Sequence, residues 1–353
     1  MTVTILIGDC RKVLRELPTE SVHCVVTSPP YWGLRDYGIG TDVFGLEPSY
    51  QIYVEHAVEI FRDVRRVLRP DGTLWLNLGD SYASTPRGNK QTGVEGWKTS
   101  GLHGAGSAVY AKTLDASAAQ KRNTIVDGLK PKDLCGIPWR VAFALQADGW
   151  WLRQDIIWSK PNPMPESVTD RCTKAHEYLF LLSKSERYYF DAEAIREDLA
   201  PWNPKWGDPN KPPKVGTRGG TFDVDAPDGV SRIRSEQGSK NVHFRDREVG
   251  RNKRSVWEIA TAPFAEAHFA TFPPALIEPC VLAGCPKGGT VLDPFFGAGT
   301  TGLVADRLGR NCIGIELNAE YAAMAERRIK QDAGMFAEVS SAIIPQIELR
   351  AAE

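Results

Sequence analysis

The chain has 353 residues, with 43 lysines and arginines against 44 aspartates and glutamates, and the net charge of −1 gives no overall sign of nucleic-acid binding. No apolar run reaches the ~18 residues of a membrane-spanning helix, and the first residues lack the pattern of a secretory leader. Seven scattered cysteines without a C-x-x-C pair favour free thiols in a reducing compartment and argue against a zinc site, so we expect a soluble intracellular enzyme.

Strand and helix patterns alternate through most of the chain. Short apolar runs predict strands over residues 4–7, 22–26, 73–80, 151–160, 290–293 and 311–315, and a hairpin over 177–190. Helical spacing predicts helices over residues 11–17, 50–68, 137–147, 275–283, 300–308 and 319–331, with Ser49 as an N-cap. A turn is expected at Pro70-Asp71-Gly72, and residues 332–353 show no clear pattern. This order predicts an α/β fold built on a mostly parallel sheet.

Two stretches lack this periodicity and carry an excess of basic residues. Between residues 81 and 132 there are 8 basic and 3 acidic residues, and between residues 201 and 254 there are 12 and 7. The second stretch also interleaves Trp202, Trp206, Phe222 and Phe244 with its basic residues. Basic and aromatic residues together suit contacts with nucleic-acid grooves and phosphates, whereas an irregular, solvated surface loop is the plainer alternative.

The segment Thr27-Ser28-Pro29-Pro30-Tyr31 directly follows one apolar run. Two prolines cannot extend a strand, so they predict a stiff turn at its carboxyl end, where α/β sheets bind their ligands. The Ser28 hydroxyl and the Pro29 carbonyl are able to accept both N–H bonds of an exocyclic amine, and Tyr31 offers a face for stacking on a flipped base. A proline-rich turn with a packed tyrosine is the alternative.

A glycine-rich loop follows a later predicted strand. Gly297, Gly299 and Gly302 have the G-x-G-x-x-G spacing that lets a cofactor approach the backbone, and Glu316 ends the next strand, where a carboxylate binds ribose hydroxyls. NAD and S-adenosylmethionine both use this geometry. Asp293 favours S-adenosylmethionine, because a carboxylate there neutralises an ammonium group but repels a pyrophosphate. No hydride-transfer partner supports the alternative of an oxidoreductase.

Five segments together resemble the DNA amino-methyltransferases, which methylate N4 of cytosine or N6 of adenine. The segments are TSPPYW at 27–32, LRPDGTLWLNLGD at 68–80, TFP at 271–273, VLDPFFGAGTT at 291–301 and IGIEL at 313–317. The catalytic motif precedes the cofactor motif, which is similar to the β-class order, a circular permutation of the sheet. The resemblance implies a seven-stranded, mostly parallel methyltransferase (Rossmann-like) sheet with an irregular target-recognition insertion.

The resemblance also implies residue roles and domains. The implied catalytic residues are Ser28, Pro29, Pro30 and Tyr31. The implied contacts of the cofactor, S-adenosyl-L-methionine, are Asp9, Thr271, Phe272, Asp293, Phe295, Gly297, Gly299, Thr300 and Glu316, and no metal is required. The implied domains are a catalytic and cofactor-binding domain over 1–164 and 255–332 with a basic insertion at 81–132, a target-recognition region over 165–254 and a tail over 333–353.

The implied function is site-specific methylation of double-stranded DNA. Serine at the first motif position is associated in this family with cytosine N4, so we expect N4 methylation, with adenine N6 as the alternative. A cytosine ring-carbon enzyme would need a cysteine nucleophile, but Cys280 falls inside an apolar helix. An RNA base methyltransferase and a catalytically inactive DNA-binding protein are more distant alternatives.

The resemblance carries expectations about setting and partners as well. We expect a cytoplasmic protein of prokaryotic or phage origin that does not associate with a membrane. A separate cognate restriction endonuclease is a candidate partner. The sequence leaves the choice between a monomer and a dimer open.

Overall fold

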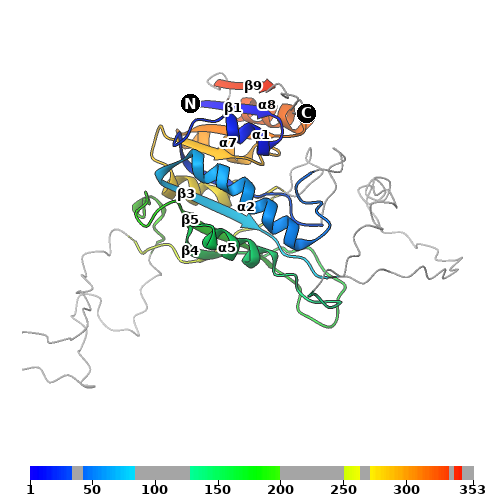
Figure 1. Ribbon diagram of the computed structural model, residues 1–353. Coiled ribbons are helices and arrows are strands. Elements are labelled where there is room, and N and C mark those ends of the chain that lie inside the picture. Colours follow the sequence, from blue (N-terminus) through cyan, green and yellow to red (C-terminus); the bar gives the residue numbers. More distant parts are fainter. Residues whose placement is uncertain (34–42, 84–127, 199–249, 263–270, 334–337, 344–353) are drawn as a thin grey trace, which may run out of the picture. The chain divides into compact units, whose positions relative to one another are not determined.

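The computed structural model describes residues 1–33, 43–83, 128–198, 250–262, 271–333 and 338–343 (Figure 1). Within these residues nine strands form one sheet in the order β6-β4-β5-β3-β2-β7-β8-β1-β9. The strands are β1 Thr2–Ile7, β2 Val22–Thr27, β3 Leu68–Leu78, β4 Trp151–Ser159, β5 His176–Ser183, β6 Val256–Glu258, β7 Thr290–Asp293, β8 Asn311–Glu316 and β9 Glu338–Ile343. β5 runs antiparallel to its neighbours β3 and β4, and the other pairs are parallel. The expected mostly parallel α/β sheet is confirmed.

The sheet has two more strands than the seven expected, one at each edge. β6 has three residues, too few to show an apolar pattern. β9 pairs with β1 in parallel from Thr2↔Glu338 to Ile7↔Ile343, inside the tail that shows no pattern in the sequence. Five of its six residues are exposed, so neither face of this edge strand needs apolar side chains and no alternation marks it.

The expected hairpin over 177–190 is wrong in its second half. β5 pairs with β3 and β4, whereas the segment after it forms no strand and contacts β3 instead. The Tyr189 amide donates to the Asp71 carbonyl at 2.9 Å, and the Phe190 ring stacks on Trp75. The separate turn expected at 70–72 is a bulge within β3, because pairing with β2 jumps from Val22↔Leu68 to Cys24↔Thr73.

Helices cover both faces of the sheet. They are α1 Cys10–Glu16, α2 Tyr50–Val67, α5 Ile137–Ala147, α6 Pro274–Gly284, α7 Thr300–Arg307 and α8 Ala319–Ala333. α2 and α5 lie over the same face (Figure 1), and α1 packs beside α2. Successive side chains of a strand point to opposite faces of the sheet. Val25 and Leu74 therefore join the core with α2 on one face, whereas Cys24 and Trp75 lie against Gly284 of α6 on the other.

The chain divides into two units, residues 1–194 with 254–353, and residues 195–253. The second unit contains described residues only at 195–198 and 250–253, where Glu197 and Arg251 exchange backbone hydrogen bonds. The expected target-recognition boundaries, 165–254, include β5, which belongs to the sheet. The two basic stretches lie mostly outside the described residues, so their role stays a prediction.

Two further properties concern the state of the cysteines and the character of the described helices. All seven cysteines are free thiols, six of them buried, which confirms the prediction from their scattered positions. None of the described helices combines the length and the apolar character that crossing a lipid bilayer demands.

Candidate active site

The carboxyl ends of the parallel strands bring the two sequence motifs to one edge of the sheet. β2 and β7 are neighbours, with Cys24 paired to Val291 and Val25 to Leu292. The segment Ser28–Tyr31 leaves β2 at this edge, and the glycine loop leaves β7 beside it. Because β5 is antiparallel, its first residues, His176 and Glu177, lie at the same edge.

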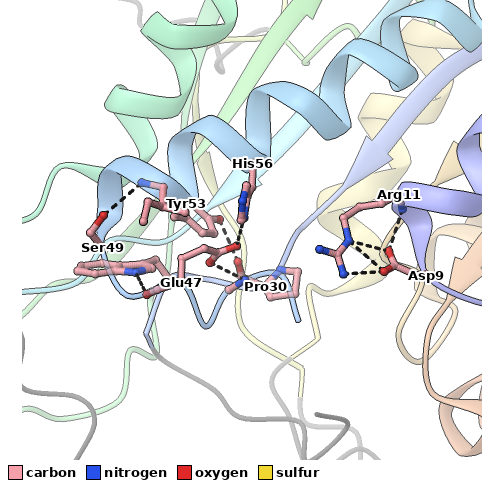
Figure 2. A network of polar contacts seen from close by, with 10 residues as sticks. Asp9, Arg11, Pro30, Glu47, Ser49, Tyr53 and His56 are labelled. Carbon is pink, nitrogen blue, oxygen red and sulfur yellow. Dashed lines mark hydrogen bonds and ion pairs between the residues drawn. The ribbon is translucent and has the colours of Figure 1, made fainter. Parts of the chain in front are cut away.

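The turn Ser28–Tyr31 is fixed from α2. The Tyr53 hydroxyl of this helix donates to the Pro30 carbonyl at 2.9 Å (Figure 2), and the Tyr53 side chain is fully buried. Among the described residues, nothing donates to the Pro29 carbonyl. One carbonyl of the turn therefore anchors it, and the preceding carbonyl remains able to accept a hydrogen bond from a ligand.

Replacing Tyr53 with phenylalanine tests this anchor. The Pro30 carbonyl would lose its donor, so we expect a loss of about 1 kcal/mol in the free energy of unfolding, with a several-fold lower kcat. Thermal denaturation and methylation kinetics measure the two effects. Tyr189→Phe removes a hydroxyl at the opposite edge of the sheet and is expected to leave kcat unchanged. A Tyr53→Phe enzyme with wild-type kcat would show that the turn holds its shape without this bond.

Tyr31 is held by its hydroxyl and by its ring. The hydroxyl donates to Glu177 Oε2 at 2.7 Å, lies 3.1 Å from Asn77 Oδ1, and accepts from Ser28 Oγ at 3.3 Å. A β-carbon at Gly79 would collide with the ring, so the chain after β3 lies directly against it. Tyr31 thus has a defined position, and its expected catalytic role stays a prediction.

Asp293 joins the two motifs. It is buried, and its carboxylate accepts hydrogen bonds from Thr27 Oγ1 at 2.6 Å, Thr301 Oγ1 at 2.7 Å and the Phe295 amide at 3.0 Å. Thr27 directly precedes Ser28, and Thr301 lies in the first turn of α7. In this arrangement the carboxylate fixes the loop against β2. Its expected contact with the cofactor's ammonium group stays a prediction.

Burial raises the pKa of Asp293 from 3.8 to about 6, against the effect of its three hydrogen-bond donors. Between these values the unfolded chain loses the proton while the folded chain keeps it. Stability therefore falls as pH rises through this window, by about 3 kcal/mol. Asp293→Asn removes this titration.

Chemical denaturation of both proteins between pH 4 and pH 7 measures the effect. The wild type should lose stability relative to Asp293→Asn as the pH rises. A difference between the two that stays constant over this range would contradict the assignment.

The glycine loop is shaped by its own backbone and by α8. Gly297 and Gly299 have φ of +51° and +75°, and a β-carbon at Gly297 would meet no atom of the described residues within 4 Å, its chain neighbours aside. The Gly297 amide donates to Glu316 Oε2 at 2.7 Å. Arg328 of α8 donates to the Ala298 carbonyl and to Thr300 Oγ1, both at 2.9 Å. The backbone of the loop is therefore open at Gly297, and a ligand is able to approach it there.

Glu316 and Asp9 end adjacent strands, since Ile7 pairs with Glu316. Burial raises the pKa of Glu316, whose carboxylate also accepts from the Asn318 amide at 2.8 Å. Asp9 caps α1 and binds Arg11, with Arg11 Nη2 at 2.7 Å from its Oδ2 (Figure 2). A ligand amine at Asp9 would share this carboxylate with Arg11.

The remaining expected cofactor residues lie around this edge. Phe295 is half-buried, and its ring stacks on Phe44 at 5.7 Å between centroids. Thr271 and Phe272 directly precede α6 and are half-buried, next to the undescribed segment 263–270. The roles of these three residues stay predictions.

The sequence analysis missed several residues of the site. Glu177, Asn77 and Tyr53 contact the Ser28–Tyr31 turn, and Arg328 contacts the glycine loop. Only Asn77 lies in one of the five segments, 68–80, and the sequence analysis gave it no role. Asn77 did leave a signal, because it is the polar residue in the apolar run Leu74–Leu78 and is buried. The others lie on ordinary helix or strand positions, where spacing carries no sign of their partners.

A family model described as DNA methylase matches residues 22–327, from β2 into α8. The chain belongs to the DNA methylase family. This DNA methylase is 46% identical over 325 residues to the Type II methyltransferase M.SmaI of Serratia marcescens, covering 92% of this chain and 90% of the relative. It is 45% identical over 327 residues to M.Cfr9I of Citrobacter freundii, covering 93% and 87%.

Solved structures share the fold of this DNA methylase. A proposed DNA modification methylase from Thermus thermophilus, complexed with S-adenosyl-L-methionine, has a TM-score of 0.54 at 22% identity, covering 97% of this chain and all of the other. The PvuII DNA methyltransferase, described as cytosine-N4-specific, has a TM-score of 0.55 at 18% identity, covering 97% and 96%. The expected family and α/β methyltransferase fold are therefore confirmed.

Proposed function

We propose that this DNA methylase transfers the methyl group of S-adenosyl-L-methionine to the N4 amine of cytosine in double-stranded DNA, at a specific sequence. The position of Ser28 is the observation that supports the proposal. Its Oγ donates to Tyr31 Oη, so the lone pairs of Ser28 are left to accept an N–H of the target base. The Pro29 carbonyl supplies a second acceptor.

Two acceptors match the chemistry of an exocyclic amine. The nitrogen lone pair of such an amine is delocalised into the ring, which makes it a poor nucleophile. Hydrogen bonds from its two N–H groups to Ser28 and Pro29 favour a pyramidal nitrogen and align its lone pair with the methyl group. The neutral, small serine suits the cytosine ring. Adenine N6 is the second candidate, because the same two acceptors fit either amine.

S-adenosyl-L-methionine supplies a methyl group activated by a positively charged sulfur. The open side of Gly297 gives this donor close access to the backbone, and Glu316 ends β8 where a carboxylate is able to bind ribose hydroxyls. Asp9, Thr271, Phe272, Phe295 and Thr300 would complete the site. Asp293 would shape the loop from behind through Thr27 and Thr301.

Nucleoside mass spectrometry of DNA treated with the enzyme and the donor tests the base assignment. N4-methylcytosine is the expected product. N6-methyladenine would leave the mechanism intact and overturn the choice of base. If varied duplexes gave neither nucleoside while RNA was methylated, the assignment of DNA as the substrate would be wrong.

The relatives named as Type II methyltransferases extend the proposal to partners. We place the target-recognition region at about 165–254, helped by the basic insertion 81–132, and we place the enzyme in the cytoplasm beside a separate restriction endonuclease of the same specificity. DNA from cells that express the methylase should then resist that endonuclease. Cleavage of fully methylated DNA would contradict this pairing.

A further inference from the structure

Methyl transfer to an amine leaves a proton to be removed, and the motif itself contains no strong base. Ser28 is a neutral hydroxyl and the Pro29 group is a carbonyl, so neither retains a proton at neutral pH. Glu177, at the same edge of the sheet, supplies the carboxylate that the motif lacks. It is joined to Ser28 through the hydroxyl of Tyr31.

The hydrogen bonds in this connection point in one direction. Ser28 Oγ donates to Tyr31 Oη at 3.3 Å, and Tyr31 Oη donates to Glu177 Oε2 at 2.7 Å. Each hydroxyl thus gives its hydrogen toward the carboxylate and turns its lone pairs toward the side where the target amine is expected. A proton that enters at Ser28 moves along existing bonds without any rearrangement of side chains.

The surroundings of Glu177 hold its carboxylate in place. Lys160, directly after β4, forms an ion pair with Oε1, and Asn77 Nδ2 donates to Oε2 at 3.2 Å. Lys174 and His176 lie close enough to interact electrostatically with the carboxylate. Since 17% of the Glu177 side chain is exposed, a proton received there is able to leave to solvent.

We propose that Glu177 takes up the proton released by the target amine, acting through Tyr31 and Ser28. The inference rests on the proposed function only in requiring an exocyclic amine as methyl acceptor, which cytosine and adenine both have. As the nitrogen–methyl bond forms and the sulfur–methyl bond breaks, the positive charge passes to the nitrogen. The nitrogen loses a proton to Ser28 Oγ, Ser28 passes its own proton to Tyr31 Oη, and Tyr31 passes its own to Glu177 Oε2. The products are a neutral methylated base, a neutral thioether and a protonated carboxyl group that releases its proton to water.

Glu177→Gln and Tyr31→Phe test the connection with little change of shape. Glutamine still accepts a hydrogen bond from Tyr31, and phenylalanine keeps the ring for stacking. We expect each to lower the single-turnover rate of methylation by about 100-fold, and the double variant to be no slower than either single variant. Donor affinity by calorimetry and DNA affinity by fluorescence anisotropy should stay at the wild-type values.

Two further measurements separate proton transfer from positioning. The wild-type rate should fall in D₂O, and the Tyr31→Phe rate should show a smaller isotope effect, because the connected protons no longer move. Glu20→Gln is the control. It removes a carboxylate that binds Lys184, the residue after β5, at 3.2 Å, and it should keep the wild-type rate.

The outcomes distinguish this inference from the proposed function. A wild-type enzyme that methylates no DNA amine would overturn the proposed function. An active wild type with an equally fast Glu177→Gln variant would overturn the inference alone, as would rate losses in Glu177→Gln and Tyr31→Phe that multiply in the double variant.

Discussion

Replacing Ser28 with alanine is expected to lower kcat by about 100- to 1,000-fold. The variant loses the oxygen whose lone pairs would accept an N–H of the target amine, and this contact strengthens as the nitrogen becomes pyramidal. The effect should fall on kcat, while the affinity for S-adenosyl-L-methionine stays unchanged, because the glycine loop is untouched. Single-turnover kinetics and calorimetric titration with the donor measure the two quantities.

Ser21→Ala is the matched control, since Ser21 lies just before β2 and donates to the Pro18 carbonyl. It should reproduce any general effect of losing a serine hydroxyl near this strand, with wild-type kcat. A Ser28→Ala enzyme with more than about a tenth of wild-type kcat would show that the amine does not depend on this hydroxyl.

Alanine substitutions at Gly297 and Gly299 of the glycine loop are expected to have different effects. At Gly297 the new methyl group meets no described residue other than its chain neighbours within 4 Å, so it enters the space assigned to the donor. At Gly299 it would lie 2.7 Å from the Ala325 β-carbon and force α8 to move. Gly297→Ala should therefore weaken donor binding by about 10- to 100-fold, whereas Gly299→Ala should lower the free energy of unfolding by about 3 kcal/mol or more.

Each glycine variant serves as the control for the other. Both place alanine in the left-handed region, at a cost of about 1–2 kcal/mol, so this strain cancels in the comparison. Calorimetry with the donor and thermal denaturation, done on both proteins, separate binding from folding. Wild-type donor affinity in Gly297→Ala would contradict the placement of the donor against this loop.

The strands and helices that carry apolar periodicity were predictable, and the edges of the sheet were not. β2, β7 and β8 are buried on both faces, so their sequences read as continuous apolar runs. β9 is exposed, and its EVSSAI sequence resembles a loop. The segment 187–190 shows the reverse error, since its aromatic residues resemble a strand, but Phe190 stacks on Trp75 and no strand forms.

Some residues of the candidate site were predictable from the sequence and others were not. Ser28–Tyr31 and the glycine loop were predictable, because prolines and glycines impose backbone shapes that few other sites need. Glu177 was not, because its importance comes from β5 running antiparallel and delivering its first residues to the edge where the other strands end. Strand direction depends on the whole sheet and leaves no local mark in the sequence.

The Asp293 carboxylate binds a residue 266 positions earlier in the chain, Thr27, and a residue 8 positions later, Thr301. During synthesis the Ser28–Tyr31 turn therefore leaves the ribosome long before the groups that hold it against the glycine loop. A nascent chain carries the SPPY segment without a donor site and is expected to be inactive until its last third has folded. Activity is therefore expected only once the sheet is complete.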